Sequence, residues 1–103
     1  MSIFSLREAL QRSPDPGSLS VELAHLGDAE LEFYAPAKVD LQKPHSRDEF
    51  YIIARGSGTF EVAGRACAFE AGDVLFVPAG IEHRFRDFSD DFATWVIFIN
   101  RQA

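Results

Sequence analysis

Residues 43–56 have the sequence KPHSRDEFYIIARG, and the rest of the chain is organised around this stretch. Its second half contains Phe50 to Ala54, an apolar run of aromatic and β-branched residues that is typical of a β-strand. His45 precedes Glu49 by four residues, and the run stops at Gly56. The stretch therefore predicts a strand that carries an imidazole and a carboxylate near its beginning.

A second stretch, residues 72–83 with the sequence GDVLFVPAGIEH, places His83 after another apolar strand and a Pro-x-Gly turn. Two imidazoles and one carboxylate form a donor set for a divalent metal such as Fe, Mn, Ni, Co or Zn. Such a set leaves coordination positions open, as a catalytic metal requires. We therefore predict a metal site at His45, Glu49 and His83. The alternative is a polar cluster without metal inside the fold.

Most of the remaining chain has strand-like patterns separated by Gly, Pro and Asp. Together with Phe50–Ala54, these segments make about eight short strands, which predicts an all-β sandwich or barrel. The run at 74–77 has little polarity, which predicts a strand covered on both faces. The other segments with a strand pattern are residues 19–23, 31–35, 59–62, 65–69, 83–88 and 92–99.

The N-terminal residues have a helical period instead. Ile3, Leu6 and Leu10 recur at helical spacing, and Ser5-x-x-Glu8 predicts an N-terminal cap. The prolines and glycine that follow end the helix expected over residues 2–12. We expect an N-terminal helix and linker over residues 1–18, and a β-barrel over residues 19–103.

Composition limits the function classes. A chain of 103 residues is large enough for one core, and its formal net charge of −6 argues against nucleic acid or an anionic membrane as a partner. The one cysteine, Cys67, excludes an intrachain disulfide, and its apolar surroundings favour a packing role. Neither a signal-peptide pattern nor an apolar run of membrane-spanning length is present, so we expect a cytoplasmic protein.

The spacing of the two stretches resembles that of the cupins, specifically the small single-domain microbial kind. Residues 45–56 match the second half of the first cupin motif, G-x5-H-x-H-x3-4-E-x6-G. Residues 72–83 match the second motif, G-x5-P-x-G-x2-H-x3-N, with Asp87 where Asn is usual. The resemblance covers roughly residues 20–100. It implies a double-stranded β-helix, the cupin jelly-roll barrel, and a homodimer.

The chain also departs from the first motif. The leading histidine of that motif falls on Lys43, which as an ammonium is no metal ligand. The three-histidine, one-glutamate set that the resemblance implies is thus reduced to the three residues above. Gln42 or Asp40 would replace the missing ligand if the strand carries a bulge, although strand parity disfavours Gln42.

The resemblance implies either a metal-dependent enzyme of the dioxygenase, isomerase or lyase type, or a non-catalytic small-molecule-binding cupin with a degenerate metal site. A metal with one carboxylate ligand keeps positive charge, which favours a small polar or anionic molecule. Lys43 and Tyr51 are the candidate substrate-binding residues; the alternatives are a surface lysine and a half-buried barrel tyrosine. Arg47 and Asp48 are expected to be solvated turn residues, and Arg84 to face outward.

Overall fold

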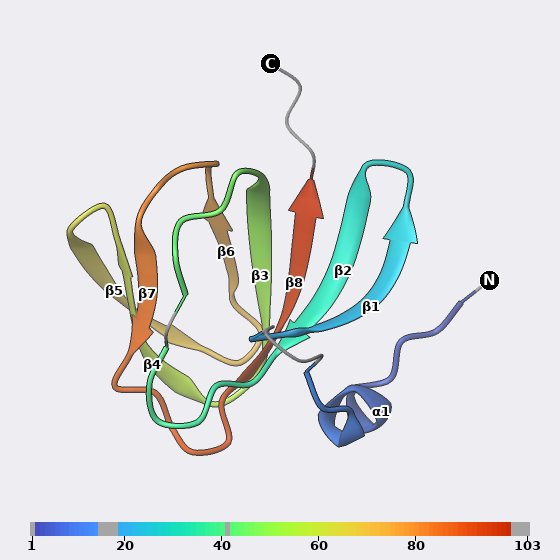
Figure 1. Ribbon diagram of the computed structural model, residues 1–103. Helices are drawn as coiled ribbons and strands as arrows, with labels where there is room; N and C mark the ends of the chain where they lie inside the picture. Colours follow the sequence, from blue (N-terminus) through green and yellow to red (C-terminus); the bar gives the residue numbers. More distant parts are fainter. Residues whose placement is uncertain (1, 15–18, 41, 100–103) are drawn as a thin grey trace.

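The computed structural model describes residues 2–14, 19–40 and 42–99, in which two antiparallel β-sheets face each other and a short helix lies beside the larger sheet (Figure 1). The strand order is β1-β2-β8-β3-β6 in one sheet and β5-β4-β7 in the other. This confirms the predicted jelly-roll fold. The elements are α1 (Leu6–Gln11), β1 (Val21–Leu26), β2 (Ala29–Tyr34), β3 (Asp48–Arg55), β4 (Ser57–Val62), β5 (Arg65–Glu70), β6 (Val74–Val77), β7 (His83–Arg86) and β8 (Ala93–Ile99).

The pleat of β3 decides which side chains enter the space between the sheets. Glu49, Tyr51 and Ile53 are buried and alternate with more exposed residues, as the two-residue period of a strand requires. The register places Tyr51 opposite Val96 on β8 and opposite Leu75 on β6, so these residues share the inner face. Glu49 therefore points inward from a strand that lies between β8 and the edge strand β6.

The core between the sheets is aromatic. Phe85 on β7 lies at its centre, and burying one such side chain contributes about 1.5–3 kcal/mol. Four rings lie around Phe85 with centroid distances between 4.7 and 5.4 Å, and they belong to Tyr51, Phe60, Phe69 and Phe92. This packing gives the nearby polar site rigid walls.

The predicted N-terminal helix is present but shorter than expected. It spans Leu6–Gln11, whereas the sequence predicts a helix over residues 2–12. The side chain of Ser5 accepts a hydrogen bond from the backbone N–H of Glu8 at 3.0 Å, which confirms the predicted cap. Ala9 packs against Phe33 on the outer face of the larger sheet. Within the described ranges, no helix is long and apolar enough to cross a membrane.

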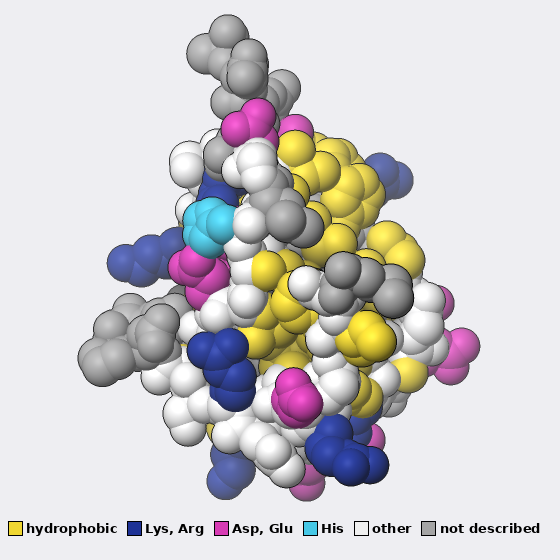
Figure 2. Space-filling model, turned by 90° about the vertical axis from the view of Figure 1, so that its right-hand side faces the viewer, with side chains coloured by type: hydrophobic (Ala, Val, Ile, Leu, Met, Phe, Trp, Pro, Cys, Tyr) yellow, Lys and Arg dark blue, Asp and Glu magenta, His cyan; other side chains and the backbone are white. Residues whose placement is uncertain are grey.

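The prediction that the 74–77 strand is covered on both faces is wrong for one copy of the chain. Val74 is 60% exposed and Phe76 is 48% exposed. The reason is that β6 is an edge strand whose alternate residues point away from the core. Hydrophobic side chains also gather on the molecular face shown in Figure 2. A homodimer that covers such apolar surface stays a prediction.

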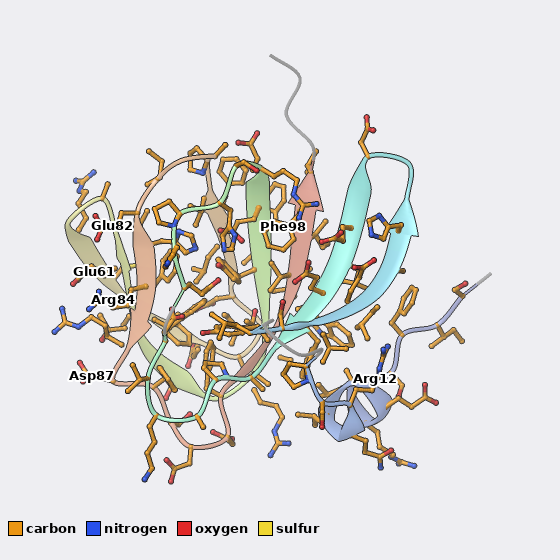
Figure 3. All side chains as sticks on the ribbon, in the orientation of Figure 1. Arg12, Glu61, Glu82, Arg84, Asp87 and Phe98 are labelled. Atoms are coloured by element: carbon orange, nitrogen blue, oxygen red, sulfur yellow. The ribbon has the colours of Figure 1, made fainter. Side chains whose placement is uncertain are left out.

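The outer side of the three-stranded sheet is polar. Arg84 is exposed, as predicted, and Figure 3 shows it projecting outward near Glu61, its partner in the strand register. Cys67 is also exposed, so the packing role predicted for it is wrong. Although Cys67 lies opposite the buried Phe60, β5 is an edge strand and the other sheet does not cover that position.

Candidate metal centre

The three predicted ligands come together between the sheets. Glu49 lies on β3, His83 begins β7, and His45 lies on the segment that leads into β3. The Nε2 atom of His83 is 2.9 Å from Oε1 of Glu49, and that of His45 is 3.9 Å from Oε2. All three donor atoms lie within 4.8 Å of one another. The fold thus assembles the arrangement that the two sequence stretches predict.

Glu49 shows that this cluster suits a cation. Its side chain is 0% exposed, and neither carboxylate oxygen has a hydrogen-bond partner among the described residues. His83 approaches closely but not in hydrogen-bonding geometry. Burying a charge without a partner costs several kcal/mol, and a divalent cation between carboxylate and imidazoles would offset that cost. The donor set therefore fits a metal ion.

The imidazole rings present their Nε2 atoms to the site. Nδ1 of His83 donates to the backbone carbonyl of Ile81 at 2.9 Å, so the lone pair of the neutral ring lies on Nε2. Burial alone lowers the pKa of His83, but the nearby Glu49 carboxylate and the Ile81 carbonyl outweigh it and raise that pKa. Burial lowers the pKa of His45, which favours the neutral ring that binds metals.

Gln42 also lies in this site, although strand parity disfavours it. Its Oε1 atom is 3.2 Å from Nε2 of His45 and accepts a hydrogen bond from the Tyr51 hydroxyl at 2.9 Å. The parity argument fails because residues 42–47 precede β3 and do not alternate as a strand. Tyr51 is fully buried, and burial followed by the charge of Glu49 raises its pKa well above the ordinary value. Contact of Tyr51 with a substrate stays a prediction.

A cavity of about 390 Å³ adjoins the cluster. Gln42 and His45 form part of its wall, and Lys43 contributes from an exposed position. Val96 and Phe98 supply an apolar wall from β8. The cavity has room for a small molecule beside the candidate ligands, and the role of Lys43 in binding it stays a prediction.

Arg47 is a residue whose role the sequence did not reveal. Its guanidinium lies 3.1 Å from Oε2 of Glu30 and 4.4 Å from the ring centroid of Phe98. The carboxylate of Asp48 accepts a hydrogen bond from the backbone N–H of Ala79 at 2.8 Å. Both are half-buried, so the prediction of solvated turn residues is wrong. No local pattern marks these residues, because their partners come from other parts of the chain.

Two carboxylates on β2 lie on the inner face of the larger sheet, and one of them, Glu32, lines the cavity. Glu30 and Glu32 lie opposite Phe98 and Val96, so they share the inner face. Burial and then the hydrogen bond with Glu30 raise the pKa of Glu32 to about 7. The hydrogen bond with Glu32 is the main reason that the pKa of Glu30 is lowered. The pair therefore holds one proton up to near-neutral pH.

We expect the free energy of unfolding of the metal-free protein to fall as pH rises from 4.5 to about 7. The cause is the raised pKa of Glu32 in the folded chain. In this window the folded chain keeps a proton that the unfolded chain has lost, so raising the pH disfavours folding. Glu32→Gln removes this contribution. Urea unfolding at about pH 5 and about pH 7.5 measures it, with the exposed Glu82→Gln as control. An undiminished pH dependence in Glu32→Gln contradicts the prediction.

Comparison with known sequences supports the relationship that the motifs indicate. A family model described as a cupin domain matches residues 30–99. The uncharacterized protein SCO3923 of Streptomyces coelicolor is 37% identical over 59 residues, which cover 57% of this chain and 56% of that protein. The match thus spans little more than half the length of this relative.

Solved structures agree in fold. Protein TT1209 from Thermus thermophilus is 22% identical, with a TM-score of 0.76 and coverage of 99% of this chain and 100% of that one. KdgF from a Halomonas species is 21% identical, with a TM-score of 0.74 and coverage of 99% and 96%. A cupin 2 conserved barrel domain protein from Salinispora arenicola is 21% identical, with a TM-score of 0.72 and coverage of 97% and 89%. At these identities the likeness concerns the fold alone.

Proposed function

The chain belongs to the cupin family, and we propose that it holds one divalent transition metal at His45, Glu49 and His83 beside a cavity for a small polar or anionic molecule. The observation that carries this proposal is the buried Glu49 carboxylate, which lacks a hydrogen-bond partner among the described residues and faces two imidazole nitrogens. Fe, Mn, Ni, Co and Zn all suit this donor set.

The residues around the cavity suit a polar reactant. A bound metal acts as a Lewis acid that polarises an oxygen atom of that reactant. Lys43 and Arg47 add positive charge to the wall, which favours an anionic molecule. Glu32, whose pKa is raised to about 7 by burial and then by Glu30, is able to hold or release a proton at the same wall. These features favour a metal-dependent enzyme of the dioxygenase, isomerase or lyase type.

A non-catalytic small-molecule-binding cupin with a degenerate metal site is the second candidate. The observation that favours it is Lys43, which stands where the first motif of the family has a histidine. The same cavity would serve such a protein. A small carboxylate that the protein binds and returns unchanged supports this second function, whereas conversion to a product supports the enzyme.

The metal site is tested by elemental analysis of protein that carries no histidine tag. Chelator-stripped protein reconstituted with each candidate metal is expected to retain about one equivalent per chain, and a metal at a hundred times its dissociation constant stabilises the fold by about 2.7 kcal/mol. His45→Ala and His83→Ala are expected to lose both the metal and this stabilisation, yet to remain folded by circular dichroism.

His25→Ala is the matched control, because His25 is exposed on β1 and belongs to a separate group with Glu22 and Glu30. It is expected to keep the metal that the other two histidine variants lose. Full metal retention in His45→Ala or His83→Ala shows that the ligand set is wrong. Absence of metal in the reconstituted wild type leaves the second candidate function.

A further inference from the structure

We propose that the side-chain oxygen of Gln42 is the fourth protein ligand of the metal, in place of the histidine that the first motif lacks here. The inference rests on the metal site proposed above. Four atoms converge between the sheets: Oε1 of Gln42, one carboxylate oxygen of Glu49, and Nε2 of His45 and His83.

The spacing of these donors suits one shared cation. With metal–ligand distances of about 2.1 Å, two ligands are separated by about 3.0 Å at a right angle and about 3.4 Å at the tetrahedral angle. Oε1 of Gln42 is 3.2 Å from Nε2 of His45. Nε2 of His83 is 2.9 Å from Oε1 of Glu49. Both separations lie near the values for neighbouring ligands of one ion, and the 3.9 Å between Nε2 of His45 and Oε2 of Glu49 joins the two pairs at a wider ligand–metal–ligand angle.

Asp40 determines which end of the Gln42 amide faces the site. Its carboxylate accepts two hydrogen bonds from Gln42, one from the backbone N–H at 3.0 Å and one from the side-chain Nε2 at 3.1 Å. Because a carboxylate only accepts here, the amide nitrogen must face Asp40 and the amide oxygen must face His45 and Tyr51. Asp40 also accepts the Tyr34 hydroxyl and the backbone N–H of Phe85 at 2.8 Å. Gln42 is thereby fixed to β7, the strand that begins at His83.

Tyr51 supports the same orientation. Its hydroxyl lies 2.9 Å from both Oε1 of Gln42 and Nε2 of His83, but it has one proton to donate. When the lone pair of His83 is engaged by a metal, the hydroxyl donates to Gln42 alone. The amide oxygen has two lone pairs, so one accepts this hydrogen bond and the other remains for the metal.

Lys43, the residue next to Gln42, is more exposed than Gln42, as the assignment of Gln42 as the ligand requires. Lys43 occupies the place of the motif histidine, yet its side chain is exposed. Gln42 is half-buried and contacts both His45 and Tyr51. The segment before β3 thus turns Gln42, and not Lys43, toward the cluster. Outer contacts of the kind that Asp40 and Tyr51 make typically orient metal ligands.

Cobalt(II) provides a test that does not depend on activity, because its visible absorption reports the ligands around the ion. Chelator-stripped wild type, Gln42→Leu, Gln42→His and Lys43→Ala are each titrated with Co²⁺ against a competing chelator. We expect Gln42→Leu to bind at least about tenfold more weakly and to change the absorption spectrum. Gln42→His is expected to recover the affinity with a spectrum shifted by a new nitrogen ligand. Lys43→Ala is expected to keep the wild-type spectrum.

The outcomes separate this inference from the function on which it rests. Wild type that binds Co²⁺, together with an unchanged spectrum and affinity in Gln42→Leu and Gln42→His, overturns the assignment of Gln42 and leaves the three-residue site standing. Wild type that binds no Co²⁺ overturns both. If Gln42→Leu fails to fold, as judged by circular dichroism, Gln42→Met decides, because it keeps the length of the side chain and lacks the amide oxygen: weaker binding with a changed spectrum supports the assignment, and wild-type binding overturns it.

Discussion

Glu49→Gln is expected to weaken metal binding by more than about hundredfold and, in the same protein, to raise the stability of the metal-free fold. The carboxylate is fully buried and has no hydrogen-bond partner among the described residues. Replacing it with a neutral amide of the same shape removes a buried charge that accepts no hydrogen bond from the described residues, a cost of about 1–3 kcal/mol that the nearby His83 offsets only in part.

The metal side of the prediction has the opposite sign. Loss of outer-shell contacts alone typically lowers metal affinity about 10–100-fold, so losing the charged ligand should exceed about hundredfold. The variant should therefore unfold at a higher urea concentration than wild type in chelator, and at a lower one in saturating metal. This reversal in the order of stability is expected only for a residue that binds the metal and destabilises the metal-free fold.

Urea unfolding in chelator measures the stability of the metal-free protein, and urea unfolding in saturating metal measures the stabilisation by the bound metal. Glu61→Gln is the control, because Glu61 makes an ion pair with Arg86 on the outer side of the three-stranded sheet. Such an exposed pair contributes about 0–1 kcal/mol and has no contact with the cluster. If Glu49→Gln is less stable than wild type in chelator, the carboxylate stabilises the metal-free protein and our reading of its burial is wrong.

The sequence predicts the part of the site that lies on regular strands. Glu49 and Tyr51 point inward because they occupy alternate positions of β3, and this period is visible in the apolar run itself. His83 follows the Pro-x-Gly turn whose spacing defines the second motif. The number of short strands predicts an all-β sandwich or barrel, and the resemblance of the two motifs to those of the cupins implies the jelly roll.

The side-chain partners that place Gln42 and Arg47 were beyond the reach of these patterns. Gln42 enters the site through its hydrogen bonds to Asp40, which lies two residues before it on a segment without strand alternation. Arg47 is held by Glu30, seventeen residues earlier in the chain. Such contacts depend on the path of the chain in space. The same holds for Phe76, whose exposure follows from its position on an edge strand.

Phe85→Ala is expected to destabilise the fold more than any surface change, by about 3–5 kcal/mol. The ring is almost completely buried and is surrounded by the aromatic side chains of both sheets. Their backbones are held by strand pairing, so they are unable to close the space that the ring leaves. For a domain of this size each kcal/mol lowers the midpoint of thermal unfolding by about 4–8 °C.

Phe76→Ala is the matched control, because it removes the same side chain from a strand position that is 48% exposed. We expect it to cost less than about half as much, since a partly exposed ring has buried less apolar area to lose. Equal destabilisation by the two variants at low protein concentration would contradict the assignment of Phe85 to the centre of the core.

Phe85 also connects the core to the site, so its loss should weaken metal binding. Its ring packs 4.9 Å from that of Tyr51, and its backbone N–H donates to Asp40. Both partners hold Gln42, so a cavity at Phe85 loosens the residues that orient the proposed fourth ligand. Saturating metal should therefore raise the unfolding midpoint of Phe85→Ala by less than it raises that of wild type. An equal rise would show that the site keeps its geometry without this support.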